Sequence, residues 1–335
     1  ADQKQVPIVR YFYKHREDMF DSHSYAKGGR VLHMLRKYVG DDAFYLALNN
    51  YLKEYKFATA EINDLRIAFE KVTGEDLNWF FDQWFMKPGH PQIKVEQEYS
   101  AATQKVRLKI SQMQDTLAST VYRLPLKVDV WVDSVKTRYD VVVNKSRQTL
   151  EFPAKSRPNL VIFDAEKQLL GTVDHLKNRQ ESIFQFYKAD KFLSRYEALT
   201  QLEGKLIDST IRRVMLTAMT DPFWKIRQVA VANFAEYDGL EFVEAERIIQ
   251  SRARIDPNSQ VRTEAILTLA SFGDNSNDPL FREALNDTSY LVVSVALDAY
   301  LIGKPGDATE VAARFENSPN DAVVAAIGHY YAGLA

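Results

Sequence analysis

The stretch DSHSYAKGGRVLHMLRKYVG, residues 21–40, passes from polar residues through a tyrosine and two glycines into an apolar periodic segment. Its end, Gly40, is placed where glycine commonly stops a helix. Paired glycines inside a helix cost about 1 kcal/mol each. We therefore expect this cost to be offset, either by a close approach that only small residues allow or by the position that the helix start gives Tyr25. The residues that share the three- and four-residue spacing of one helix face are Tyr25, Gly28, Val31, Leu32, Leu35, Tyr38 and Val39.

The rest of the first 90 residues also has helical patterns. Apolar residues recur at helical spacing over 41–55 and 59–74, and a short aromatic helix is predicted over 75–89, where a Pro-Gly pair ends it. Thr59 is a plausible N-cap for the second of these helices, and Gly74 its stop.

The period changes from 3.6 to 2 over residues 91 to about 173. Short alternating segments with polar breaks between them predict a small antiparallel β-sandwich. Its hairpin turns are expected at Asp133-Ser134 and at residues 164–167. The predicted strands are KVRLKI, LPLKVDVWV, YDVVV, TLEF and NLVIF.

Residues from about 177 to 335 are helical again and repeat. Similar segments start at Asp221, Asp256, Asp287 and Ser318, at spacings of 35, 31 and 31 residues, with a weaker copy from Asp190. Each copy has a turn residue followed by a helix. A helix-turn-helix period in the thirties predicts an α-solenoid resembling HEAT or armadillo arrays.

These patterns predict a multidomain α+β chain with three parts: 1–90, helical; 91–176, a β-sandwich; and 177–335, a HEAT-like repeat domain. The first residue is not Met and the sequence begins abruptly, so we expect a fragment of a longer protein.

Composition excludes several classes of function. The 43 basic and 45 acidic residues nearly balance, so bulk charge gives no argument for nucleic-acid binding. The chain has no cysteine, which excludes disulfides and thiolate chemistry. No run of about 18 apolar residues predicts a membrane span. The compartment stays open between the cytoplasm and a bacterial periplasm, and so does the oligomeric state.

The usual catalytic motifs are missing. The six histidines form no H-E-x-x-H, and the chain has no nucleotide-binding glycine loop. His15 and His23 lie near acidic residues, but solvated surface side chains explain them better than a metal site. We therefore expect neither metal ligands nor cofactor-binding residues in this chain, which has no complete catalytic constellation.

Tyr25 is the one candidate catalytic residue. It could be a core tyrosine, since it lies in line with the apolar face of the following helix. It could instead be a phenol at a helix start that donates a hydrogen bond into a cleft. Gly28 and Gly29 would then let another helix or a substrate approach closely.

Residues 20–95 resemble the zinc aminopeptidases of the membrane alanyl aminopeptidase family, gluzincins related to leukotriene hydrolase. The family commonly has Glu where this chain has Ala26. The motifs that carry the resemblance are Tyr25-Ala26-Lys27-Gly28, Val31-Leu32-His33-Met34-Leu35, Thr59 with Asp64-Leu65, Gly74-Glu75-Asp76-Leu77, Phe80-Phe81, Trp84 and Pro88-Gly89-His90-Pro91.

The resemblance implies a fold and a reaction. Residues 1–90 would be the helical end of a thermolysin-like catalytic domain. In such enzymes an H-E-x-x-H helix and a later Glu bind zinc, the metal activates water, and a G-x-M-E-N loop holds the amine of a peptide substrate. The tyrosine that matches Tyr25 hydrogen-bonds the oxyanion of the tetrahedral intermediate. None of the zinc ligands lies in this sequence, so the resemblance implies zinc only in a full-length protein and an inactive chain by itself.

An alternative is a non-catalytic scaffold, because HEAT-like arrays commonly bind proteins. The solenoid could limit access of peptides to the active site, or serve only as packing. An upstream H-E-x-x-H with a distal Glu would favour the enzyme over the scaffold.

Overall fold

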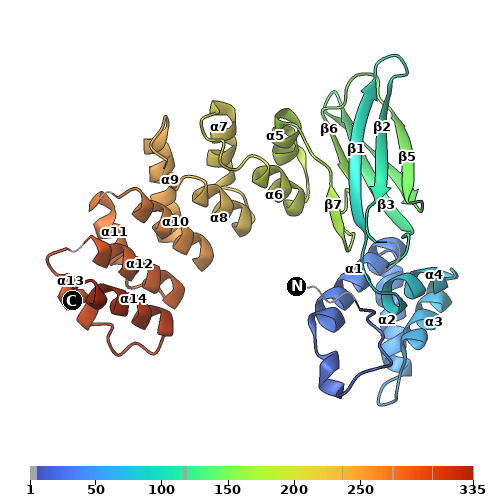
Figure 1. Ribbon diagram of the computed structural model, residues 1–335, viewed down its shortest axis with the longest axis horizontal. Coiled ribbons are helices and arrows are strands. Elements are labelled where there is room, and N and C mark those ends of the chain that lie inside the picture. Colours follow the sequence, from blue (N-terminus) through green and yellow to red (C-terminus); the bar gives the residue numbers. More distant parts are fainter. Residues whose placement is uncertain (1–5, 116–118, 236, 274, 304, 335) are drawn as a thin grey trace. The chain divides into compact units, whose positions relative to one another are not determined.

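The computed structural model describes residues 6–115, 119–235, 237–273, 275–303 and 305–334. The chain forms two compact units, Ala1–Lys177 and Asn178–Ala335. The first contains helices and two small sheets, and the second contains helices (Figure 1). The predicted three-part division into 1–90, 91–176 and 177–335 stays a prediction. No helix in the described ranges has both the length and the hydrophobicity needed to cross a membrane.

The first unit begins with helices that gather at one end of its strands (Figure 1). Gly40 and Gly74 end α1 and α3 with φ of 86° and 71°, as their positions in the sequence predict. Glu61, not Thr59, is the N-cap of α3, because Asp64 accepts the Glu61 N–H at 2.7 Å. The elements are η1 (Arg16–Met19), the π-helical turn η2 (His23–Lys27), α1 (Gly28–Val39), α2 (Asp41–Glu54), α3 (Ile62–Thr73), α4 (Asn78–Phe81) and the π-helical turn η3 (Asp82–Met86).

The sheets have the orders β5-β2-β1-β7 and β4-β3-β6. All pairs are antiparallel except β1 with β7. The polar segment of β1 and the short β7 were not among the predicted strands. The strands are β1 (Gln92–Ser100), β2 (Lys105–Gln112), β3 (Leu124–Val132), β4 (Val135–Val143), β5 (Arg147–Pro153), β6 (Leu160–Phe163) and β7 (Thr172–Asp174).

One hydrophobic cluster joins the helices and the strands of the first unit. Leu35 and Phe69 from the helices are fully buried, as are Leu108 and Val128 from the strands. The indole of Trp84 lies 5.1 Å from the ring of Tyr122, centroid to centroid, across the boundary between helical and β segments. The two regions therefore share one core.

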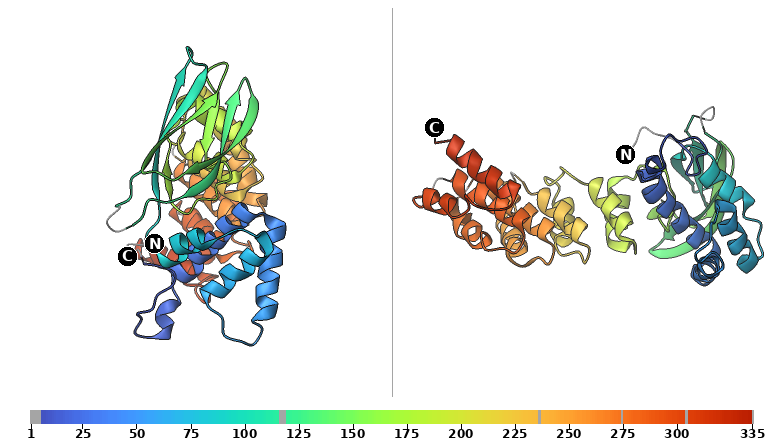
Figure 2. Two further views of the ribbon diagram at one scale, coloured as in Figure 1. Left: turned by 90° about the vertical axis from the view of Figure 1, so that its right-hand side faces the viewer. Right: turned by 90° about the horizontal axis from the view of Figure 1, so that it is seen from below.

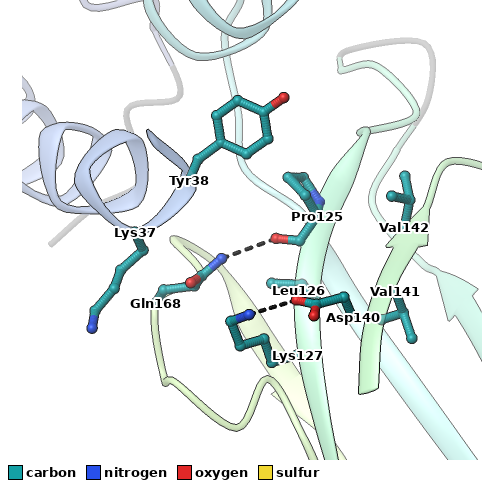
Figure 3. Close-up of a pocket in the computed structure, with 9 residues that line it drawn as sticks. All are labelled: Lys37, Tyr38, Pro125, Leu126, Lys127, Asp140, Val141, Val142 and Gln168. Atoms are coloured by element: carbon teal, nitrogen blue, oxygen red, sulfur yellow. Dashed lines mark hydrogen bonds and ion pairs between the residues drawn. The ribbon is translucent and has the colours of Figure 1, made fainter. Parts of the chain in front are cut away.

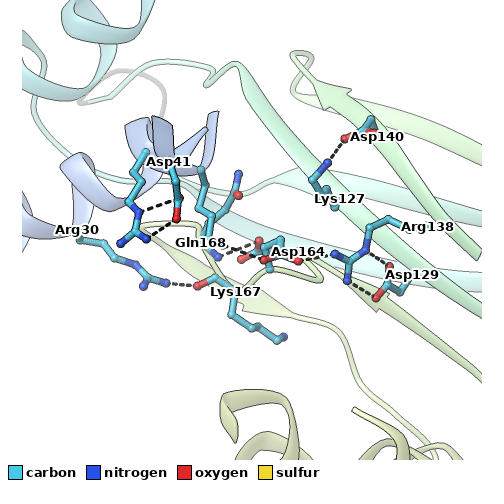
Figure 4. A network of polar contacts seen from close by, with 12 residues as sticks. Arg30, Asp41, Lys127, Asp129, Arg138, Asp140, Asp164, Lys167 and Gln168 are labelled. Carbon is cyan, nitrogen blue, oxygen red and sulfur yellow. Dashed lines mark hydrogen bonds and ion pairs between the residues drawn. The ribbon is translucent and has the colours of Figure 1, made fainter. Parts of the chain in front are cut away.

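The two predicted hairpin turns have different outcomes. Asp133 and Ser134, with φ of 50° and 66°, form the turn between β3 and β4. The expectation for residues 164–167 is wrong, because β6 and β7 lie in different sheets. The buried carboxylate of Asp164 accepts the N–H groups of Gln168 and Leu169 at 3.1 and 3.0 Å, which folds this segment into a loop (Figure 4).

That loop is held against α1. The guanidinium of Arg30 donates to the carbonyl oxygen of Lys167 (Figure 4). It also donates to the carbonyl oxygen of Leu169. Lys37 pairs with Glu166 at 3.1 Å. The connection between the sheets therefore positions the helix that follows Tyr25.

The second unit consists of helices that follow one another in chain order (Figure 2). α8, α10, α12 and α14 each begin three residues after a predicted repeat start, and they contact one another in succession. The helices are α5 (Arg179–Lys188), α6 (Phe192–Thr200), α7 (Ser209–Ala218), α8 (Trp224–Ala232), α9 (Phe242–Ile255), α10 (Ser259–Ser271), η4 (Asn275–Asn277), α11 (Asp278–Ala284), α12 (Tyr290–Ile302), α13 (Ala308–Ala313) and α14 (Asp321–Ala332).

Buried ion pairs link the repeats. The carboxylate of Asp256 is fully buried and accepts two hydrogen bonds from Arg227, both at 2.7 Å. It also accepts the N–H of Asn258 before α10, and Arg227 donates back to the carbonyl of Asp221. One repeat thus neutralises the charged turn of the next. The equivalent pairs are Arg195 with Asp221 and Arg262 with Asp287.

We expect Arg227→Met to destabilise the second unit by about 3 kcal/mol, because it leaves the buried Asp256 carboxylate without its two short hydrogen bonds and with only the longer 3.5 Å contact to Arg252. Arg254→Met is the matched control. Arg254 pairs with Glu283 at the surface, so its loss costs under about 1 kcal/mol. Urea unfolding of the full chain measures both. The double variant Arg227→Met/Asp256→Leu should recover most of the lost stability. Equal losses in Arg227→Met and in the control Arg254→Met would contradict the role of the buried pair.

Candidate functional site

Tyr25 lies in η2, one turn before α1, and 63% of its surface is exposed. It is therefore not a core residue of the described chain. The glycines behind it differ: Gly28 is buried and Gly29 exposed. A Cβ added at Gly29 would meet no atom within 4 Å, so the expected close approach at Gly29 is made by no described residue.

The turn that carries Tyr25 is fixed by its neighbours. Asp21 accepts the N–H of Ser24 through its carboxylate at 2.9 Å and the N–H of Tyr25 through its carbonyl at 3.2 Å. The guanidinium of Arg10 donates to the other carboxylate oxygen of Asp21 at 2.9 Å. Sequence reasoning missed this arrangement, although an Asp three residues before a Ser at a helix start is a recognisable capping pattern.

The negative charge of Asp21 strengthens its hydrogen bonds to Ser24 and Arg10. Burial opposes ionisation of Asp21, but the Ser24 N–H and the Arg10 guanidinium outweigh it and lower the pKa of Asp21 to about 2. Asp21 is therefore a carboxylate throughout the neutral range.

Lys27, two residues after Tyr25, is partly buried. Its ammonium donates to the carbonyl oxygens of Val6 and Gly89, both at 3.3 Å. Burial lowers the pKa of Lys27, and burial together with the Lys27 charge lowers the pKa of His90. The lysine ties the start of the chain to the Pro-Gly segment that precedes β1.

Exposed aromatic side chains surround this turn in the sequence. Phe12 and Phe20 are 98% and 71% exposed, and the ring centroid of Phe20 lies 5.6 Å from that of Tyr25. Tyr11 and Tyr13 are also exposed. Such a concentration of exposed aromatic side chains is typical of a surface that contacts another molecule or segment.

The described residues include no group of three or more His, Asp or Glu side chains that could hold a metal ion. The side chain of His23, weighed with His15 as a metal ligand, lies outside what the structure describes. The zinc expected for a full-length protein therefore finds no fitting ligand set in the described part of this chain.

A groove of about 280 Å³ lies elsewhere in the first unit, between the end of α1 and strands β3 and β4 (Figure 3). Lys127 pairs there with Asp140, and the Gln168 amide donates to the Pro125 carbonyl. Tyr25 does not line this groove, so it does not extend the candidate site.

Asp21→Asn should remove a pH-dependent part of the stability. Because folding lowers the pKa of Asp21 to about 2, from about 3.9 in unfolded chains, its contribution is complete above about pH 5 and is lost as the pH falls towards 2. We expect the melting temperature of the wild-type chain to exceed that of Asp21→Asn at pH 5–8, and the two to converge near pH 2. A difference that is unchanged at pH 2 would contradict this.

Residues 3–84 match the sequence model of the peptidase family M1 domain, and residues 211–301 match that of HEAT repeats. The chain is 33% identical over 144 residues to probable aminopeptidase 1 of Sulfurisphaera tokodaii. The aligned region covers 40% of this chain and 18% of that protein. It is 31% identical over 138 residues to leucyl aminopeptidase of Saccharolobus solfataricus, over 41% of this chain and 17% of that protein.

A solved structure has a similar fold. The crystal structure of Legionella pneumophila aminopeptidase A in complex with aspartic acid matches with a TM-score of 0.70 and 14% sequence identity, over 96% of this chain and 45% of that one. The match and the HEAT repeats confirm the predicted fold class, a multidomain α+β chain with a HEAT-like solenoid.

The chain thus spans less than half of that solved chain, and the matched regions are under a fifth of the two curated relatives. Hydrolase, metallopeptidase and aminopeptidase describe the family of these relatives. The M1 match over residues 3–84 and the aminopeptidase relatives, with the similar fold of the solved structure, support an M1-family aminopeptidase fragment.

Proposed function

We propose that this chain is the C-terminal part of a zinc aminopeptidase that removes N-terminal residues from peptides, and that Tyr25 is its catalytic contribution. The phenol of Tyr25 donates a hydrogen bond to the oxyanion that develops on the scissile carbonyl. Zinc, when bound by ligands outside this chain, would supply Lewis acidity and an activated water. The observation that carries the proposal is the exposed Tyr25 on a fixed turn inside the M1 match.

Two further features support this role. A donor helps catalysis most when it is already held where charge develops, so that it need not reorganise during the reaction. The Asp21 contacts hold the backbone of Tyr25 in that way. The exposed aromatic rings of Phe12 and Phe20 supply an apolar surface that a peptide or the zinc-binding part of the domain would cover.

A non-catalytic scaffold is the second candidate. The HEAT match over residues 211–301 favours it, because such arrays bind proteins without any catalytic residue. Under this alternative Tyr25 would have no role in peptide hydrolysis.

The isolated 335-residue chain should bind no stoichiometric zinc and should not cleave an aminoacyl-arylamide, because its sequence has no H-E-x-x-H segment. Metal analysis of the purified chain after dialysis against zinc measures the first, and a chromogenic assay the second. One tightly bound zinc per chain would overturn the expectation.

In the protein that joins this chain to the zinc-binding segment, Tyr25→Phe should lower kcat by about 10²–10³-fold and leave KM within about twofold. The substitution keeps the ring that contacts Phe20 and removes only the hydroxyl. Tyr45→Phe, which alters an exposed tyrosine on α2, is the control and should leave kcat unchanged. An unaltered kcat in Tyr25→Phe would favour the scaffold.

A further inference from the structure

Arg10 and Asp21 form an ion pair beside the turn that carries Tyr25. We propose that Asp21 and Arg10 are positioning residues that fix the main chain of Tyr25, from which its phenol reaches the scissile carbonyl. The inference rests on the proposed function of Tyr25 and adds two residues to it. Neither Asp21 nor Arg10 is assigned contact with the substrate.

The contacts of Asp21 leave the turn little freedom. Its carbonyl oxygen and its carboxylate accept the N–H groups of Tyr25 and Ser24, at 3.2 and 2.9 Å. Two successive main-chain donors are thereby bound to a single residue. Tyr25 can then vary mainly through its side-chain torsions, while its Cα stays in place.

Arg10 fixes Asp21 in turn. One guanidinium nitrogen donates to Asp21 at 2.9 Å, and another approaches the hydroxyl of Ser24 at 3.4 Å. The side chain of Arg10 is only 11% exposed, and that of Asp21 23%. The pair is thus shielded enough for its geometry to be better defined than that of a surface ion pair.

The core of the first unit anchors Arg10. The preceding residue, Val9, donates its N–H to the carbonyl of Phe85 at 3.0 Å, and Phe85 is buried. Contacts therefore run from the aromatic core through Val9 and Arg10 to Asp21, and from there to Tyr25. A displacement of about 1 Å at a catalytic group can cost about 10²-fold in rate, so this anchoring would matter to the reaction.

A double-mutant cycle in the zinc-containing protein tests the inference. We expect Asp21→Ala to lower kcat by about 10–100-fold with KM changed less than about twofold, and Asp21→Asn, which keeps one acceptor for the Ser24 N–H, to lower it less. In the Tyr25→Phe background, Asp21→Ala should cost less than about twofold more, because Asp21 acts through the missing hydroxyl. Arg10→Met should behave like Asp21→Ala.

The matched control is Asp41→Asn. Asp41 also pairs with an arginine, Arg36, at the opposite end of α1, and its loss should leave kcat unchanged. Amide hydrogen exchange over residues 22–28 of the isolated chain gives a second readout that needs no activity. We expect exchange there to be about tenfold faster or more in Asp21→Ala and unchanged in Asp41→Asn.

The outcomes separate the two proposals. If Tyr25→Phe leaves kcat unchanged, the proposed function fails, and the positioning role falls with it. If Tyr25→Phe lowers kcat but Asp21→Ala and Asp21→Asn do not, only the positioning inference is overturned. Additive losses in the double variant, or unchanged exchange over residues 22–28 in Asp21→Ala, would also overturn it.

Discussion

Asp256 carries a charge that solvent does not reach, and the second unit holds that charge because Arg227 donates two hydrogen bonds to it, with Arg252 at 3.5 Å as a weaker second partner. Such a pair adds little stability compared with an apolar contact, but losing one partner is costly. Its effect is to make each repeat depend on the next. The first unit uses the same interaction on a smaller scale, where Arg10 approaches Asp21 and defines the turn that carries Tyr25. In both units an arginine fixes an aspartate that in turn accepts a main-chain N–H at or just before a helix start.

The ion pair between Arg10 and Asp21 shows how the main chain of an exposed tyrosine can be held in a fixed position. Tyr25 has little packing of its own, since its ring is mostly exposed and its ring contact is with Phe20, itself exposed. Its backbone is nevertheless bound by Asp21, and α1 behind it is held by Arg30 against the loop between β6 and β7. The helix start is therefore rigid where it meets the core and open where the phenol points. A preorganised hydrogen-bond donor needs both properties.

Periodicity in the sequence predicted the helical repeats of the second unit and the alternating strand β3. The solenoid helices begin three residues after the recurring Asp or Ser, because the side chain of each accepts the main-chain N–H two residues further on and so forms the same turn before the helix. The strand β3 has the bounds that its alternation predicts. Two local expectations were wrong for a common reason. Residues 164–167 and the start of α3 are shaped by carboxylates, those of Asp164 and Asp64, whose partners cannot be recognised from periodicity.

Tyr25 is in line with the apolar stripe of α1 only if the helical period continues back through residue 25. The wider π-helical turn η2 interrupts that period, and the tyrosine is exposed.

The catalytic role proposed for Tyr25 depends on where its hydroxyl lies in a complete, inhibited enzyme. A crystal structure of the zinc-containing protein with a phosphinic peptide, whose phosphinyl oxygens stand in for the tetrahedral oxyanion, would measure it. We expect a Tyr25 Oη to phosphinyl oxygen distance of about 2.5–3.0 Å, with the Arg10–Asp21 pair intact behind the turn. A phenol that points away, with no phosphinyl oxygen within about 3.5 Å of its oxygen, would contradict it.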